Sequence, residues 1–337
     1  MGAEQPIPRR LTAVPGWEVS PSGRAPERRA NTGGGAMTSE IPTRPELGDI
    51  VVGVDGSLSA RTAVLWAAAE ADRRGRTLHI VHAADSDRRA LFADAETLQA
   101  VRAAGRDLLN ETASAVHYLF PDLAVTKELS RQEPVAGLRA AAGRRGTIVV
   151  GNRGLGGFST LMLGSVGLGV AARAEVPVIV VRGDTDRSDT GSVTAAVRGA
   201  SDTGWLLVAA AEADARTSVL RLVSVWNVLT HLGRVATTLD DPEGIARQRV
   251  NEIRALADRV LDFYPRLIVK HHVETGTSTP GLLVEASAHT DLLVMGREHR
   301  VLGAGPSLGR VAHVLLHHAH CPVEIVPPAY ATRLEEN

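Results

Sequence analysis

The chain has 337 residues, enough for two domains of ordinary size. Of these residues, 44% are hydrophobic and 22% are charged. Its net charge of −1 gives no general attraction to nucleic acid or to an anionic membrane, and no apolar run reaches membrane-spanning length. The single cysteine, Cys321, excludes an intrachain disulfide framework. The N-terminus lacks the apolar core of a signal peptide, so we expect a cytoplasmic protein that binds neither nucleic acid nor a membrane.

Residues 1–46 are rich in proline and arginine and contain the glycine run 33–35. They show no apolar periodicity, which predicts a disordered tail. Met37 stands just before the first periodic segment. Two interpretations of residues 1–36 therefore stay open, a tail or an upstream start that is not used.

Strand and helix patterns alternate from residue 50 onward. We expect strands at 50–55, 77–83, 124–129, 148–150 and 178–181, and helices at 59–74, 98–119, 134–143 and 164–174. Residues 86–96 are polar and show no regular pattern. The alternation predicts a doubly wound, five-stranded parallel sheet with helices on both faces. Asp55 follows the first strand, where it could line a ligand site or cap the next helix, and Ser57 or Ser59 could also be the cap.

The stretch 148–182 is a strand, a glycine-rich loop, a helix and a second strand. Its spacing is G-x2-G-x9-G-S, through Gly151, Gly154, Gly164 and Ser165. Such a unit brings backbone N–H groups and a helix N-terminus to the carboxyl edge of a parallel sheet, where anionic ligands bind. The stretch has no G-x-G-x-x-G, no P-loop motif and no lysine, which argues against a dinucleotide site and a P-loop NTPase.

This spacing, with its flanking apolar strands and the VPVIVV ending, resembles the ATP-binding signature of universal stress proteins. The resemblance implies the adenine nucleotide alpha hydrolase-like fold, ATP as the ligand and a role in stress or dormancy. Asp55 is the carboxylate that could hold Mg²⁺ between the phosphates. The nucleotide-binding positions that the resemblance implies are Gly53, Val54, Asp55, Ala83, Gly151, Asn152, Arg153, Gly154, Gly164, Ser165 and Val166.

The second half of the chain repeats the first. VPVIVV at 176–181 returns as CPVEIV at 321–326, and Gly151 and Gly164 return as Gly296 and Gly309. This constant offset predicts a tandem duplication. The second sheet should use 193–197, 219–225, 268–273, 292–296 and 323–326, with helices near 203–213, 244–263, 280–289 and 309–318. The predicted organisation is a tail at 1–46, domains at 47–183 and 192–328, a linker at 184–191 and a C-terminal tail at 329–337.

The ligand positions change in the second copy. Arg198 stands in the place of Asp55, His299 in that of Gly154 and Arg310 in that of Ser165. A ring and a long cation replace a bare backbone and a small hydroxyl, so we predict that the second domain does not bind ATP in the family manner. Its arginines could serve another anion, pair across the domains or be solvated. These arginines are Arg198, Arg297, Arg300 and Arg310.

Two further groups of side chains could carry chemistry. His313 and His317 have metal-ligand spacing on a predicted helix, near His318 and His320, but no HExxH motif supports a metal site. Arg153, Ser159 and Thr160 lie around the glycine loop without an acid–base pair, so weak ATP hydrolysis at most is expected.

The sequence thus favours an ATP-binding regulatory protein with one competent site per chain, acting through conformation or an unknown protein partner. A slow ATPase or another nucleotide-dependent enzyme, and an interaction protein without nucleotide, remain alternatives. The last strand of each domain, 178–181 and 323–326, commonly pairs domains edge to edge in this family, and an exposed apolar edge invites such pairing. We therefore expect the two domains to form a pseudo-dimer within the chain, and whole chains to form a homodimer.

Overall fold

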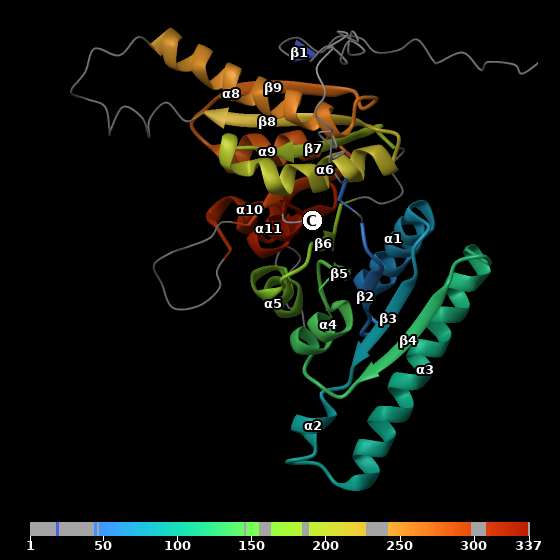
Figure 1. The fold of residues 1–337 in the computed structure, drawn as a ribbon. Coiled ribbons are helices and arrows are strands. Elements are labelled where there is room, and N and C mark those ends of the chain that lie inside the picture. The colour runs from blue at the N-terminus through green and yellow to red at the C-terminus, as the bar shows by residue number, and fades with distance from the viewer. Residues whose placement is uncertain are drawn as a thin grey trace, which may run out of the picture.

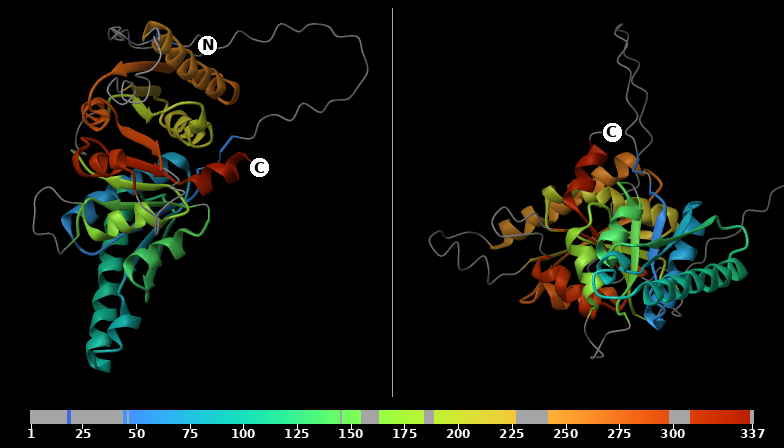
Figure 2. Two further views of the ribbon diagram at one scale, coloured as in Figure 1. Left: turned by 90° about the vertical axis from the view of Figure 1, so that its left-hand side faces the viewer. Right: turned by 90° about the horizontal axis from the view of Figure 1, so that it is seen from below.

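The structure is a computed structural model that describes residues 18–19, 44–45, 47–144, 146–154, 163–183, 189–226, 242–297 and 308–335. The described chain forms two α/β halves stacked on one another (Figures 1 and 2). No helix of these residues is both long and apolar enough to cross a membrane.

The first half alternates strands and helices as the sequence predicts. Its elements are β2 (Ile50–Gly53), α1 (Leu58–Arg74), β3 (Leu78–Ala83), α2 (Ser86–Arg89), α3 (Ala95–Leu119), β4 (Val125–Ser130), α4 (Pro134–Ala142), β5 (Thr147–Gly151), α5 (Ser165–Arg173) and β6 (Val178–Val181). The strands are parallel, in the order β6-β5-β2-β3-β4. Helices α1 and α3 pack against one another, and α4 and α5 lie on the opposite face (Figure 1). The helices that follow β2 and β5, two neighbouring strands, therefore cover opposite faces of the sheet.

The second half has the same order of elements. They are β7 (Ser192–Ala196), the short 3₁₀ helix η1 (Ala200–Asp202), α6 (Thr203–Ala215), β8 (Val219–Trp226), α8 (Pro242–Phe263), β9 (Val269–Thr275), α9 (Thr279–Ser287), β10 (Leu292–Gly296), α10 (Arg310–His318), β11 (Val323–Val326) and α11 (Pro328–Glu335). Its parallel strands have the order β9-β8-β7-β10-β11. The expected fold of two tandem doubly wound sheets is confirmed.

The two halves join through their last strands. β6 and β11 pair antiparallel, with Ile179 opposite Glu324, so both sheets continue into one. The edge-to-edge pairing predicted for these strands is confirmed. Because Ile179 and Glu324 are equivalent positions of the repeat, an approximate twofold axis passes beside this pair. The pairing also covers the two apolar edges that would otherwise invite other chains.

A buried charge cluster lies beside this seam. Arg74 of α1 donates to Glu70, 2.7 Å away, and to Glu212 of α6, 2.5 Å away. Arg216, which follows α6, donates in turn to Glu70 at 2.5 Å and to Glu212. Burial alone would raise the pKa of Glu70, but the charges of Arg216 and Arg74 outweigh it and lower that pKa to about 2. Each half thus contributes one carboxylate and one guanidinium to a single cross-linked tetrad.

Glu324 is a third buried carboxylate at this seam. It faces the electrostatic field of Arg74, Arg216, Glu70 and Glu212, but among the described residues its oxygens accept no hydrogen bond. Burial raises the pKa of Glu324 well above its usual value, with the negative charge of Glu212 adding to the effect. Three carboxylates here face two fully buried arginines, with Arg73 at the solvent-exposed rim. Glu324 therefore holds its proton to a higher pH than an exposed glutamate does.

A raised carboxyl pKa predicts that wild-type stability falls as pH rises. Above pH 4.5 the unfolded chain releases the Glu324 proton that the folded chain retains. Relative to wild type, Glu324→Gln should therefore gain up to about 1.4 kcal/mol of unfolding free energy per pH unit, until Glu324 ionises in the folded state. Urea unfolding between about pH 5 and 7 measures this difference. Parallel pH profiles for the two proteins would show that Glu324 is ionised when folded.

Three segments differ from the sequence prediction. Glu18 and Val19, in the predicted disordered tail, form the two-residue strand β1 on the edge strand β9, and Arg44 donates to Phe263 O at 2.8 Å. An edge strand offers unpaired backbone groups to any nearby segment, and two residues are too few for a periodicity to show. Residues 86–96 include α2 and the start of α3, whose N-cap is Asp94. The predicted C-terminal tail forms most of α11, which packs against α6 and buries Tyr330. The domain limits otherwise stay a prediction.

Candidate functional site

The carboxyl ends of β2 and β5 bring three predicted site residues together. Asp55 follows β2, Gly154 follows β5, and Gly164 precedes α5. A Cβ added at Gly154 would lie 2.6 Å from Asp55 Oδ2, and one added at Gly164 would lie 3.5 Å from the Gly154 nitrogen. Side chains at these two glycines would therefore crowd the space between Asp55 and the helix. This is the switch point of the sheet, where open α/β folds bind ligands.

Helix α5 begins at this place without a side-chain cap. Gly164 is its N-cap, in extended conformation, and has no side chain with which to cap the helix. The Gly164 N–H donates to Asn152 O at 2.9 Å, which ties the helix start to the loop. The next N–H groups, of Ser165 and Val166, belong to the first turn, which has no intrahelical acceptors. A helix start of this kind attracts an anion.

Asp55 does not cap helix α1. Ser57 is the N-cap, because its hydroxyl accepts from Ala60 N at 3.1 Å. Asp55 Oδ1 instead accepts from Ser57 N at 2.9 Å, and its other oxygen faces Gly154. The capping alternative for Asp55 is therefore wrong, and the carboxylate is directed toward the switch point.

Ser59 supports the loop, a role that the sequence did not reveal. Its hydroxyl donates to Asn152 Oδ1 at 2.7 Å and accepts from Arg153 N at 3.1 Å. The Ser59 carbonyl also lies 2.6 Å from where a Cβ of Gly151 would stand, so only glycine fits at the end of β5. The pairing of Ser59 with residues far along the chain leaves no local sequence signal.

Ala83 ends β3, next to β2, on the same edge of the sheet. The preceding residue, His82, donates from its ring nitrogen Nδ1 to Val54 O, 2.8 Å away. Nδ1 carries the proton because a carbonyl oxygen can only accept. This bond joins the ends of β2 and β3. Gly53, Val54 and Ala83 thus lie beside the switch point, on the side away from α5.

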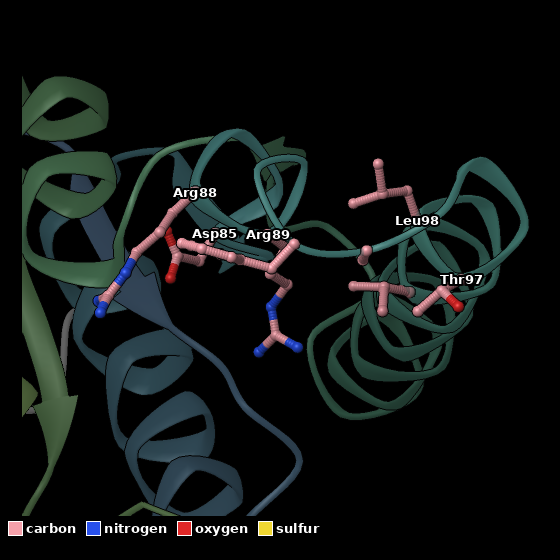
Figure 3. A pocket seen from close by; sticks show the side chains of 8 residues that line it. Asp85, Arg88, Arg89, Thr97 and Leu98 are labelled. Carbon is pink, nitrogen blue, oxygen red and sulfur yellow. The ribbon is translucent and has the colours of Figure 1, made fainter.

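Ser159 and Thr160, which the sequence analysis considered for ATP hydrolysis, lie outside the described residues. A cavity of about 290 Å³ lies farther along this edge, between α2 and α3 (Figure 3). Asp85, two residues beyond Ala83, lines it together with Arg88, Arg89 and apolar side chains of α3. This cavity is distinct from the switch point, and none of the predicted site residues lines it.

The corresponding place in the second half is built differently. Arg198 follows β7 and donates its side chain to Asp202 at 3.0 Å. A Cβ at Gly296, the counterpart of Gly151, would lie 2.5 Å from the Trp205 indole nitrogen, so a large ring replaces the small Ser59. Arg310 begins α10 and is exposed. His299 and Arg300 lie outside the described residues.

Arg297 and His317 make contacts between the halves. Arg297 donates to the carbonyls of Ala171 and Ala172 at the end of α5. His317 Nδ1 accepts from Leu163 N at 3.1 Å, and its ring lies tilted against that of His313, with the ring centroids 4.5 Å apart. No group of three or more His, Cys, Asp or Glu residues that could hold a metal occurs within the described ranges. Cys321 is buried.

The family model for the universal stress protein family matches the chain twice, at residues 47–182 and 193–327. Universal stress protein Rv2028c of Mycobacterium tuberculosis is 29% identical over 275 residues, which cover 74% of this chain and 96% of that protein. Universal stress protein Rv2623 of the same species is 33% identical over 149 residues, but this alignment spans 42% of this chain and 48% of that protein, about half of its length.

The solved structures agree on the fold. A universal stress protein from Archaeoglobus fulgidus superposes with a TM-score of 0.61 at 17% identity, over 84% of this chain and 99% of that one. A putative universal stress protein from Pseudomonas aeruginosa superposes with a TM-score of 0.55 at 17% identity, over 88% and 98%. Two matches in tandem and relatives aligned over most of their length lead to one conclusion. The chain belongs to the universal stress protein family.

Proposed function

We propose that the chain binds an adenine nucleotide, ATP with or without Mg²⁺, at the switch point of its first half. The observation that carries this proposal is the convergence of Asp55, Gly154 and Gly164 at the uncapped start of α5. Backbone donors without side chains, a helix N-terminus and one carboxylate suit a phosphate chain that can carry a divalent ion.

Different residues of the proposed site would contact the phosphates and the adenine. The N–H groups of Gly154, Ser165 and Val166, with the Ser165 hydroxyl, would hold phosphate oxygens, and Arg153 would add positive charge. Gly53, Val54 and Ala83 would line the adenine side, while Gly151 and Asn152 shape the loop between. A magnesium ion would neutralise phosphate charge, and Asp55 would hold it.

We infer one nucleotide site per chain. In the second half, Arg198 takes the place of the carboxylate, Trp205 fills the space behind Gly296, and Arg310 replaces the small hydroxyl. The nucleotide would then act on conformation or on a protein partner through the first half. A homodimer of chains also remains a proposal, and it would need a surface other than β6 and β11, which pair with each other.

The test compares the purified protein with Asp55→Ala. Denaturation and anion-exchange analysis of the supernatant identifies nucleotide that was carried through purification, and calorimetry with Mg-ATP measures binding to the emptied protein. We expect binding by the wild type and weaker Mg-ATP binding by Asp55→Ala, because the variant loses the carboxylate beside Gly154. ATP turnover well above the Asp55→Ala control would favour the slow ATPase, and absence of binding at millimolar ATP would favour the interaction protein without nucleotide.

A further inference from the structure

Helix α5 is held at both ends by side chains of the second half. At its start, the Leu163 N–H donates to His317 Nδ1 at 3.1 Å. At its end, Arg297 donates to Ala172 O at 2.8 Å and to Ala171 O at 3.1 Å. These carbonyls belong to the last turn, which has no partners within the helix, and a cation there also suits the helix dipole.

We propose that His317 and Arg297 are positioning residues through which the second half sets the phosphate affinity of the first-half site. This inference rests on the proposed nucleotide site. It goes beyond that site, because it assigns a task to the half in which the ligand positions are replaced.

The contact of His317 acts on the helix start through one residue. Leu163 is 8% exposed and stands directly before Gly164, the N-cap of α5. Its side chain packs beside Gly167, one turn into the helix. The hydrogen bond to His317 therefore fixes the direction in which the chain enters α5. The direction of entry orients the N–H groups of Ser165 and Val166. A change at His317 therefore alters the orientation of the groups that would donate to phosphate.

The first half also holds a helix of the second half. Arg182, directly after β6, donates to the carbonyls of Leu315 and Leu316 at the end of α10. Helix α10 carries His317, and both leucines are fully buried. Figure 1 shows α5 and α10 one above the other. Contacts thus run in both directions between the halves, joining His317 to Leu163 before α5 and Arg182 to the end of α10, so an anion that orders the start of α5 should also order α10.

The experiment compares three variants with the wild-type full chain. His317→Leu removes the acceptor, His317→Asn keeps an oxygen near the position of Nδ1, and His318→Leu changes an exposed neighbour on the same helix. Calorimetry measures the dissociation constants of Mg-ATP and of adenosine, and thermal unfolding reports stability. Adenosine has no phosphate, so its affinity should not depend on the start of α5.

We expect His317→Leu to weaken Mg-ATP binding by about three- to tenfold, the value of one lost hydrogen bond, and to leave adenosine binding within about twofold. His317→Asn should recover most of the affinity, and His318→Leu should match the wild type. Arg297→Met, at the other end of the helix, should weaken Mg-ATP in the same selective way, and it tests the inference if His317→Leu does not fold.

Two outcomes would overturn the inference while leaving the proposed site intact. One is wild-type Mg-ATP affinity in both His317→Leu and Arg297→Met. The other is an equal loss for Mg-ATP and adenosine together with a lower unfolding temperature, because this result describes a purely structural contact. If the wild type binds neither ligand, the proposed function fails and this inference fails with it.

Discussion

Replacing Arg74 with methionine should lower the free energy of unfolding by about 3–5 kcal/mol, because the change breaks a buried ion pair from one side. The Arg74 side chain is 1% exposed and binds Glu70, Glu212 and the Thr147 hydroxyl. Methionine fills similar space but has no charge. Glu212 would then keep only Arg216, which it shares with Glu70, while Glu70 would also keep the partly exposed Arg73. The two buried carboxylates would be left with less compensating charge.

Arg249→Met is the matched control for this prediction. Arg249 donates to Glu252 at 2.9 Å, and both side chains are partly exposed, at 27% and 36%. An ion pair in contact with water contributes about 0–1 kcal/mol, so its loss should cost little. Urea unfolding followed by circular dichroism measures both variants. Equal effects of Arg74→Met and Arg249→Met would contradict the view that the tetrad holds the halves together.

Gly154→Ala should weaken Mg-ATP binding by about 10- to 150-fold, the loss of one hydrogen bond to a charged phosphate. The new Cβ would lie 2.6 Å from Asp55 Oδ2, so the carboxylate has to move away from the site that it lines. The methyl group would also stand beside the Gly154 N–H. Calorimetry on the variant, after a check of its circular dichroism spectrum, measures the effect.

Two alanine variants separate the ligand site from the fold. Gly164 has ordinary helix N-cap angles, and a Cβ there meets nothing closer than 3.5 Å, so the fold should accept Gly164→Ala. That Cβ lies next to the Gly154 nitrogen and should still weaken binding. Gly309 has nearly the same backbone angles at the start of α10. Gly309→Ala should bind as the wild type does, and a lower number of nucleotides bound per chain there would place nucleotide in the second half.

The repeated pattern of apolar strands predicted most of the fold. Strands such as 148–150 and 178–181 are short continuous apolar runs, typical of a parallel sheet covered on both faces. The edge pairing of 178–181 with 323–326 was expected from the resemblance to universal stress proteins and from the exposed apolar edges. The sequence could not show that a two-residue segment of the N-terminal tail adds to β9, because so short a strand has no periodicity.

The tetrad shows what local patterns leave out. Glu70 and Arg74 are four residues apart on a helix, the spacing of an ordinary surface pair. Glu212 and Arg216 repeat the same spacing, and this coincidence in both copies was the available signal. Only the pairing of α1 with α6 across the seam turns two surface pairs into one buried cluster.

At the candidate site, the sequence placed the glycines and Asp55 on one edge of the sheet but could not supply their supports. Ser59 reaches Asn152 across 93 positions of the chain, and Leu163 reaches His317 across 154. Contacts of this kind depend on how helices pack, which local periodicity does not determine. Only the structure therefore shows the contacts that hold the site in place.

The most direct test of the account is the stoichiometry of Mg-ATP binding to nucleotide-free wild-type protein in a calorimetric titration. A single site in the first half predicts about one nucleotide per chain, with binding weakened by Asp55→Ala or Gly154→Ala and unaffected by Gly309→Ala. About two nucleotides per chain would contradict the loss of the second site, and no binding at millimolar ATP would contradict the nucleotide site itself.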